Sequence, residues 1–534
     1  MKVKYGLSNL RRLKQIPPIE IRPITILVGR NSSGKSTFLR SLALLRQSIT
    51  TRTSSPILWY GDLVDFGSYS ISISEVGRHI SFTFVVDSLT STDYRRPVPF
   101  PPRLRSFDNY KDIQYTITIV PKGTHTRIQQ LALSVESLKI RCVINVNEDN
   151  AIDSVILNGK DVKSLLSDIS LNIGFGSIFP EMSALRKKED RPLHLTAGHL
   201  YYRAYNPDRP LEVLVSFLKR HLAKNLSIEK LYEIANSVLS RFDNEGGRGL
   251  LNTPLKGMKT VTSWRRFVEK ANKDEIIQRD FMNAVYLSIL PEIVNLTSAA
   301  LRSTVTKLLY IGPARARSDR YYRYQDLSVS EIDPDGKNFP MFLNSLSSHQ
   351  VSALSAWIEN LFGYGLVVSR PEGGGHLSID LVEHNVKFNI VDTGYGISQI
   401  LPVLAQIWWA RERKVIQAGN SSAPTILAIE QPELHLHPAH QALLADAFVG
   451  EAVVEKDRQK DHRVHFLVET HSETLINRLG ELISINRLRP EDIHIILFEP
   501  DKEDEGVTRT SVATFSPDGS LLNWPFGFFQ PSVN

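Results

Sequence analysis

The chain has 534 residues, of which 42% are hydrophobic and 22% charged, and its formal net charge is +6. This composition excludes an intrinsically disordered chain, and no apolar run approaches the roughly 18 residues that a membrane span requires. The single cysteine, Cys142, excludes an internal disulfide and a zinc site built from cysteines. We expect a soluble, cytoplasmic protein without a membrane partner.

The first predicted elements are an apolar strand at residues 24–28, a loop rich in Gly and Ser, and a helix that begins near Lys35. Residues 113–119 and 140–146 then alternate between apolar and polar side chains, which is typical of half-buried strands. A proline-rich stretch at 96–102 predicts a loop. We therefore expect the first 160 residues to hold the start of an α/β core and a β-rich lobe.

The middle of the chain has a different pattern. Apolar residues recur every three to four positions in residues 211–222, 228–242 and 275–290, which predicts helices. Residues 186–270 contain 17 basic and 9 acidic side chains. This excess can attract a polyanion, and a solvated helical surface explains it equally well. We assign residues 161–304 to a basic, mainly helical insertion.

The last part of the chain, residues 305–534, alternates predicted strands with predicted helices. The strand candidates are residues 308–311, 426–429, 465–468 and 494–498. This alternation of strands and helices favours a mainly parallel sheet. The predicted fold class is therefore α/β, a mixed sheet with flanking helices whose two parts, 1–160 and 305–534, flank the helical insertion.

The loop after the first strand matches the phosphate-binding pattern G-x-x-x-x-G-K-[ST]. Its glycines let backbone N–H groups turn toward phosphate oxygens, its lysine reaches the β- and γ-phosphates, and its serine hydroxyl can bind Mg²⁺. The sequence therefore predicts a site for ATP and Mg²⁺. The residues expected to contact the nucleotide are Gly29, Asn31, Ser32, Ser33, Gly34, Lys35, Ser36 and Thr37.

A second acidic motif follows the apolar strand at 426–429. Glu430 stands at the end of this strand, where a carboxylate can hold Mg²⁺ beside Ser36, directly or through water. Glu433 is a second acidic group in the same segment. We therefore predict that Ser36 and Glu430 are the metal-binding pair.

Several segments carry a family resemblance. Residues 430–438, Glu-Gln-Pro-Glu-Leu-His-Leu-His-Pro, resemble the Walker B and D-loop region of ATP-binding-cassette-type P-loop NTPases of the structural-maintenance-of-chromosomes (SMC) and overcoming-lysogenisation-defect groups. Residues 468–472, Val-Glu-Thr-His-Ser, resemble the switch-histidine segment of these ATPases. Residues 392–399 are similar to their signature loop in a divergent form.

Two further segments, 309–315 and 523–529, resemble a subgroup of bacterial ATPases that is related to the ATPase subunits of Septu-type and retron-associated anti-phage systems. The resemblance covers residues 1–85 and 305–534. It implies a homodimer or higher oligomer in which two ATP molecules lie between subunits. It also implies that His471 contacts the γ-phosphate and that the signature loop of the second subunit contacts the same nucleotide through Gly394, Gly396, Ser398 and Gln399.

One residue departs from the family pattern. Cassette ATPases commonly have a glutamate directly after the Walker B acid, and this chain has Gln431 there. An amide cannot accept a proton as a carboxylate does, but it can position a water molecule. We expect slow hydrolysis, with Gln431, Glu433 and His471 as the catalytic candidates. Ordinary activity of a subgroup variant is the alternative.

Four other clusters have two interpretations each. His435, His437 and His440 could suggest a metal site, but a D-loop conformation explains them better. The acidic run at 499–505 is expected to be a solvated turn rather than a nuclease site. Nucleic acid, either DNA or a nucleoprotein complex, is a candidate partner for two mixed basic and aromatic groups. These are the Arg and Tyr residues at 315–324, which could instead form an interface near the nucleotide, and Trp264, Arg265 and Arg266 with Lys256 and Lys259.

The resemblance implies an ATPase that dimerises around ATP and controls a separate nuclease effector in bacterial anti-phage defence. The main alternative is a DNA-clamping ATPase of DNA repair or chromosome maintenance, which would bind duplex DNA in a salt-sensitive manner. A third interpretation is a scaffold that senses nucleotide without hydrolysing it. A transporter subunit is disfavoured by the large insertion.

Overall fold

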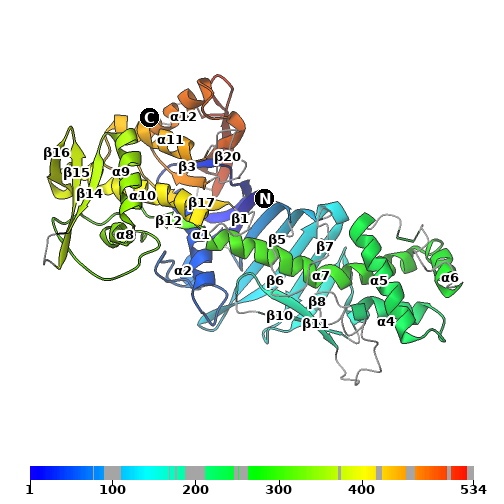
Figure 1. Ribbon diagram of the computed structural model, residues 1–534. Helices are drawn as coiled ribbons and strands as arrows, with labels where there is room; N and C mark the ends of the chain where they lie inside the picture. The colour runs from blue at the N-terminus through cyan, green and yellow to red at the C-terminus, as the bar shows by residue number, and fades with distance from the viewer. Residues whose placement is uncertain are drawn as a thin grey trace.

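The computed structural model describes residues 1–75, 77–89, 110–166, 169–174, 177–186, 211–245, 250–251, 262–370, 375–416, 424–452, 464–501 and 507–525. Two large sheets lie side by side near the N-terminus, and one long helix runs along the second of them (Figure 1). The predicted loop at 96–102 lies outside the described residues, as do Lys256, Lys259, most of the acidic run and the last residues of the C-terminal segment.

The first sheet forms the core of an α/β unit. Its strands are, in spatial order, β12 (Leu309–Ile311), β17 (Thr425–Glu430), β18 (Val464–Glu469), β3 (Ile24–Gly29), β19 (Ile493–Pro500), β20 (Thr508–Phe515) and β21 (Leu521–Leu522). The first five are parallel and the last two pair antiparallel, so the sheet is mixed as predicted. Every residue of β3 and β17 is buried, which explains why these strands read as continuous apolar runs.

Helices cover both faces of this core sheet. Helix α1 (Lys35–Thr50) packs on one face, and α10 (Tyr395–Ile416), α11 (Pro438–Ala452) and α12 (Glu473–Ser484) pack on the other. Successive side chains of β3 point to opposite faces of the sheet. Leu27 packs in the hydrophobic cluster around α1, whereas Ile26 and Val28 pack in the cluster around α10, α11 and α12. This is the layered α/β arrangement that the sequence predicts.

The second sheet, which we call the lobe sheet, is antiparallel. Its spatial order is β2 (Leu13–Glu20), β1 (Val3–Leu10), β4 (Ile80–Ser88), β5 (Lys111–Lys122), β6 (His125–Val135), β7 (Ile140–Val146), β8 (Ile152–Leu157) and β9 (Lys160–Asp161). Every second residue of β7 is buried, which matches its sequence alternation. The short α2 (Tyr69–Ser72), η2 (Glu136–Leu138) and η3 (Lys163–Leu166) lie in the connections.

The middle segment is helical after a β-hairpin. The hairpin, β10 (Ile169–Gly174) with β11 (Glu181–Arg186), lies in the region expected to be mainly helical. The helices are α4 (Leu211–His221), α5 (Ile228–Glu245), α6 (Thr262–Ala271) and α7 (Glu275–Thr306). The division of the chain at residues 160 and 304 stays a prediction.

Helix α7 continues well past the predicted end at residue 290, through Pro291. Burial on all sides of its second half outweighs the hydrogen bond that proline removes, because the surrounding protein holds the helix in place. By length and composition alone α7 could cross a membrane, but 89% of its most apolar window is buried inside the protein. Its apolar character is therefore explained by packing.

Polar contacts fasten α7 to the lobe. The Asn295 side chain accepts a hydrogen bond from the Met182 N–H at 2.7 Å and donates one to the Met182 carbonyl at 2.9 Å. The Ser298 hydroxyl donates to the Pro180 carbonyl at 2.8 Å and lies 2.9 Å from the Tyr115 hydroxyl. The helix, the hairpin and the lobe sheet are thus connected by buried polar groups that are satisfied.

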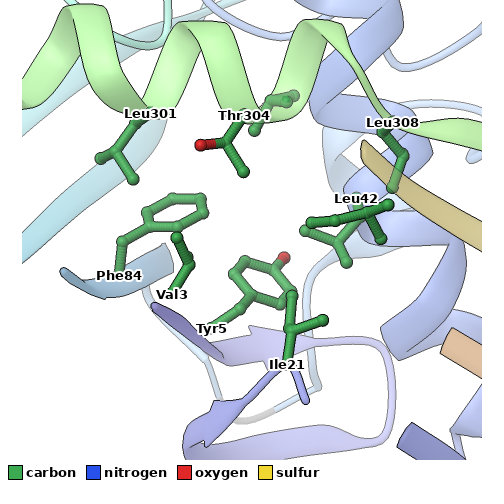
Figure 2. A pocket seen from close by; sticks show the side chains of 10 residues that line it. Val3, Tyr5, Ile21, Leu42, Phe84, Leu301, Thr304 and Leu308 are labelled. Carbon is green, nitrogen blue, oxygen red and sulfur yellow. The ribbon is translucent and has the colours of Figure 1, made fainter. Parts of the chain in front are cut away.

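The lobe and the α/β core share one hydrophobic interior. Figure 2 shows a small apolar pocket where β1, β4, α1 and α7 meet. The Thr304 hydroxyl donates to the Ala300 carbonyl of its own helix at 2.9 Å, which leaves the pocket walls apolar. The lining residues are Val3, Tyr5, Ile21, Leu42, Phe84, Leu301, Thr304, Val305, Leu308 and Ile426.

A third, smaller unit precedes α10. It contains α8 (Phe339–Ser345), α9 (Ser348–Phe362), β13 (Tyr322–Arg323), β14 (Gly365–Ser369), β15 (His376–Glu383), β16 (Val386–Asn389) and η4 (Ile390–Asp392). Strands β13 to β16 form an antiparallel sheet beside α9, at the left of Figure 1. A last turn, η5 (Pro490–Asp492), leads into β19.

Candidate functional site: the nucleotide site

The phosphate loop joins β3 to α1 and depends on its two glycines. Gly29 and Gly34 have φ angles of 154° and 98°, in the region that favours glycine. A Cβ on Gly29 would lie 2.3 Å from the Phe498 carbonyl oxygen, and one on Gly34 would lie 2.4 Å from a Leu13 methyl carbon. Because Gly34 caps α1, the loop presents the N-terminus of a helix to any anion bound there.

Lys35 is folded back into the loop that carries it. Its side chain is only 3% exposed, and its Nζ donates to the carbonyl oxygens of Gly29 at 3.0 Å and Arg30 at 2.9 Å. A carboxylate oxygen of Glu469 lies 3.7 Å from the same nitrogen. Burial lowers the pKa of Lys35, and the Glu469 charge opposes that shift. The lysine nitrogen therefore lies inside the loop, between two carbonyl oxygens and a carboxylate.

Two carboxylates stand side by side at the ends of β17 and β18. Glu430 and Glu469 are direct partners in the parallel register, and both are nearly fully buried. The Ser36 hydroxyl donates to Glu469 Oε1 at 2.9 Å. The predicted metal-binding pair, Ser36 with Glu430, is therefore not joined by a hydrogen bond. Instead, Ser36 bonds an acidic residue that the sequence interpretation did not single out.

Glu430 is bound by other groups. Arg40 of α1 donates to both of its oxygens, each at 2.7 Å, and the Tyr310 hydroxyl donates to Oε1 at 2.8 Å. The two hydrogen bonds to the Glu430 carboxylate raise the pKa of Arg40 far above its usual range. In contrast, burial and then the neighbouring Glu430 charge raise the pKa of Glu469. Glu469 Oε2 is buried and has no hydrogen-bond partner among the described residues.

Gln431 occupies a bent position just after β17. Its φ is 43°, in the left-handed region, and its N–H donates to the Glu469 carbonyl at 2.8 Å. This contact fixes the start of the following segment against β18. The amide side chain is half-buried, so it lies at the edge of the site.

Glu433 and His471 form a connected pair. Glu433 is buried, and its Oε1 accepts a hydrogen bond from the His471 N–H at 2.6 Å. Burial raises the pKa of Glu433, whereas partial burial and nearby Lys35 lower the pKa of His471. The structure thus gives Glu433 a positioning role, because it holds the backbone of the switch-histidine segment.

The Arg and Tyr group is divided between interior and surface. Arg315 is buried and donates to the Glu430 carbonyl at 3.0 Å, and burial lowers its pKa to about 10. Arg320 pairs with Asp392, while Tyr321 and Tyr324 are exposed. Arg315 therefore belongs to the nucleotide site, and only the remainder of the group is open to a partner.

The signature segment begins α10. Gly396 is required by close packing, since a Cβ there would lie 2.2 Å from the His435 carbonyl oxygen. Ser398 donates to the Tyr395 carbonyl at 2.9 Å and Gln399 donates to the Ala316 carbonyl at 3.0 Å, so both side chains shape this segment. Gly394 has no atom within 4 Å of an added Cβ and is open.

Two of the histidines after Gln431, His435 and His440, pack against different aromatic residues. The His435 ring stacks edge-on against Tyr395 with a centroid distance of 4.9 Å. His440 packs near Phe362 and Tyr364. Among the described residues, no group of three or more metal-binding side chains gathers here or elsewhere.

Similar solved structures include the Smc head domain with an extended coiled coil from Pyrococcus furiosus, bound to the C-terminal domain of ScpA, with 13% identity, 96% coverage of each chain and a TM-score of 0.32. The SMC head domain from Thermotoga maritima has 9% identity, coverage of 96% of this chain and 98% of that chain, and a TM-score of 0.31. No protein of curated function matches the sequence significantly.

A family match covers most of the chain. Residues 1–476 match the family described as AAA ATPase domain. This range contains the phosphate loop, the strand-end acids and the His471 segment. The chain therefore belongs to the AAA ATPase domain family.

Proposed function

We propose that the protein binds ATP with Mg²⁺ and hydrolyses it slowly, as a cytoplasmic dimer that encloses the nucleotide between two subunits. The observation that carries this proposal is the arrangement of buried Lys35, half-buried Ser36 and buried Glu469 where adjacent parallel strands end. Ligands of open parallel α/β sheets bind at this edge. The family match supports nucleotide binding independently of that geometry.

The residues present fit a divalent cation. The Ser36 hydroxyl and a buried carboxylate oxygen without a partner are the hard oxygen donors that Mg²⁺ prefers. Ser36 and a strand-end carboxylate would hold the ion, which would supply charge neutralisation for the phosphates. Lys35 would exchange its loop carbonyl contacts for phosphate oxygens, and the N-terminus of α1 would add its dipole.

Slow turnover follows from the chemistry of the residue after the Walker B strand. The Gln431 amide can orient a water molecule by hydrogen bonding but cannot take its proton. Glu433 holds the His471 backbone, and so places the imidazole at the end of β18 near Lys35. Burial and nearby Lys35 lower the pKa of this imidazole, which favours its neutral form, in which one ring nitrogen can accept a hydrogen bond while the other donates.

A second subunit would complete the site. The signature segment lies at the start of α10, and Tyr395 and Val391 are exposed beside it. Exposed apolar side chains around a glycine-containing helix start are suited to contact another protein surface. In the proposed dimer, Gly394 and Gly396 of one subunit face the phosphate loop of its partner, while the buried side chains of Ser398 and Gln399 hold the segment in shape.

The proposed biological setting is anti-phage defence with a separate nuclease effector. The support is the sequence resemblance, together with the long α7, which connects the helical segment to β12 beside the nucleotide site. The competing role is DNA clamping in chromosome maintenance. The exposed basic residue Arg266 on α6 favours that role, whereas Trp264 of the same group is buried in the helical core.

Steady-state ATP hydrolysis tests the enzymatic part of the proposal. We expect measurable wild-type turnover that is lost in Lys35→Ala and raised in Gln431→Glu, with exposed Lys337→Ala as the matched control. Loss of the lysine should also weaken ATP binding by about 100-fold, because a charge-assisted contact is worth up to about 3 kcal/mol. Unchanged binding in Lys35→Ala would refute the site.

Two measurements test the assembly and the setting. Light scattering of the wild-type protein, which is expected to hydrolyse ATP slowly, should show a dimer with ATP that ADP does not support. DNA binding at low salt separates the two roles, since the clamp predicts salt-sensitive binding that Arg265→Glu with Arg266→Glu weakens. Strong binding that these changes abolish would favour the clamp over effector control.

A further inference from the structure

We propose that Glu469, rather than Glu430, is the protein carboxylate that meets the divalent cation of a bound nucleotide, together with Ser36. This inference rests on the proposed nucleotide site and specifies its metal ligands. It assigns the role to the strand that carries the switch-histidine segment, not to the strand that carries the Walker B motif.

The sheet topology places Glu469 closer to the phosphate loop. Strand β18 lies between β17 and β3, so Glu469 belongs to the strand that directly neighbours the loop-bearing strand, and its register partner there is Leu27. Glu430 is one strand farther away. The hydrogen bond from Ser36 to Glu469 at 2.9 Å follows from this placement.

The two carboxylates also differ in what already binds them. Both oxygens of Glu430 accept hydrogen bonds from Arg40, and one also accepts from Tyr310. To bind a cation, Glu430 would have to give up charge-assisted bonds, which are about twice as strong as neutral ones. Arg40 therefore neutralises Glu430 and fixes it as a structural anchor between α1 and β17.

Glu469 has fewer hydrogen-bond partners than Glu430. Ser36 satisfies one oxygen, Lys35 lies 3.7 Å from that same oxygen, and the other oxygen is buried without a partner. A buried carboxylate oxygen without a partner is costly, and such an atom in a folded protein calls for a ligand or ion. A cation beside Ser36 would satisfy that oxygen and would compensate the negative charge of Glu469.

The test measures how much Mg²⁺ strengthens nucleotide binding. The dissociation constant of a fluorescent, non-hydrolysable ATP analogue is measured with Mg²⁺ and with EDTA, and their ratio gives the gain from the metal. In Glu469→Gln we expect that ratio to fall by at least about tenfold, which is the range for lost interactions around metal sites. Binding in EDTA should remain, because Lys35 and the loop are intact.

Two matched variants complete the design. Glu430→Gln should keep the Mg²⁺ gain, and Glu481→Gln, an exposed glutamate on α12, should match the wild type. Circular dichroism and thermal unfolding verify that each variant folds. The inference is overturned if Glu430→Gln loses the Mg²⁺ gain while Glu469→Gln keeps it. The proposed function, in contrast, fails if the wild-type protein binds no nucleotide in either condition.

Discussion

The α/β core and the lobe sheet bury different kinds of polar group. In the described strands of the lobe sheet, the buried hydroxyls are those of Tyr5, Ser81, Tyr115, Thr118 and Thr126. Ser81 and Thr118 bond each other across two strands at 3.1 Å. These groups are neutral and locally satisfied, so the lobe is stable through apolar packing and its ladder of backbone hydrogen bonds.

The edge of the core sheet buries charges instead. Lys35, Arg315, Glu430, Glu433 and Glu469 are all less than 9% exposed and lie close together at the ends of parallel strands. Burying a charge costs free energy unless it is paired, and replacing such groups with apolar ones often stabilises a protein. Charges concentrated at one edge therefore indicate chemistry rather than stability, and the two regions should respond differently to substitution.

The largest effect should come from the lobe interior. Phe84→Ala removes a ring that packs against Tyr5 at 5.1 Å and Phe179 at 5.4 Å between ring centroids. We expect a loss of about 3–5 kcal/mol in the free energy of unfolding, measured by urea denaturation. Exposed Ile71→Ala is the control, and a loss below about 1 kcal/mol would contradict the packing described for the lobe.

Breaking a buried charge pair at the core edge should lower the free energy of unfolding by a somewhat smaller amount. Arg40→Ala leaves Glu430 buried with Tyr310 as its remaining side-chain partner. We expect a loss of about 3 kcal/mol, the lower end for a buried pair because Arg40 is partly exposed. The double variant Arg40→Met with Glu430→Gln should recover much of that loss in the same denaturation experiment. Additive losses in the double variant would mean that the pair is not coupled.

Lowering the pH should reduce the free energy of unfolding through the protonation of His494. Burial and nearby Arg22 lower its pKa from 6.5 to about 4, and its Nε2 lies 3.2 Å from the Thr25 hydroxyl. Because the unfolded chain takes up a proton below pH 6.5 that the folded protein takes up only near pH 4, stability falls as pH falls through this window. Between pH 7.5 and pH 5 this histidine should account for about 2 kcal/mol.

The His494→Gln variant isolates that contribution. Its free energy of unfolding should fall by about 2 kcal/mol less than that of the wild type over the same pH interval. Equal pH dependence in the two proteins would show that His494 is not the group responsible.

The smallest effect should come from a hydroxyl of the lobe. Ser298→Ala leaves the Tyr115 hydroxyl, which is buried, without its partner on α7. We expect a loss of about 1 kcal/mol in the free energy of unfolding. Adding Tyr115→Phe should cost little more, since both partners are then apolar, and a second loss of similar size would argue against their pairing.

The contrast between the two regions also separates what the sequence predicts from what it does not. Strands such as 140–146 follow from alternation, and the phosphate loop follows from its motif, because both depend on neighbouring residues. The hairpin at 169–186 was missed although Ile169, Leu171 and Ile173 alternate with polar residues in a short strand pattern. The continuation of α7 through Pro291 could not be predicted, because it depends on burial by distant elements.

Glu469 illustrates the limit at the site itself. The signal was present as an acidic residue at the end of an apolar strand, next to Thr470 and His471. Its contact with Ser36 joins residues 433 positions apart and depends on β18 being the neighbour of β3. The sequence predicts Glu430 as a metal ligand from its motif, and that stays a prediction, whereas the contact of Arg40 with Glu430 becomes visible only in three dimensions.

The length of α7 has a mechanical consequence. The helix has 32 residues, and its C-terminal end leads into β12, where Tyr310 bonds Glu430 at the nucleotide edge. At 1.5 Å per residue it is about 48 Å long, so a tilt of about 10° at this end would displace its far end by about 8 Å. Asn295 and Ser298 bond the same helix to the hairpin and the lobe, so α7 joins the nucleotide edge to α4, α5 and α6 through one continuous element, and a rearrangement around the phosphates that tilted α7 would move these helices with it.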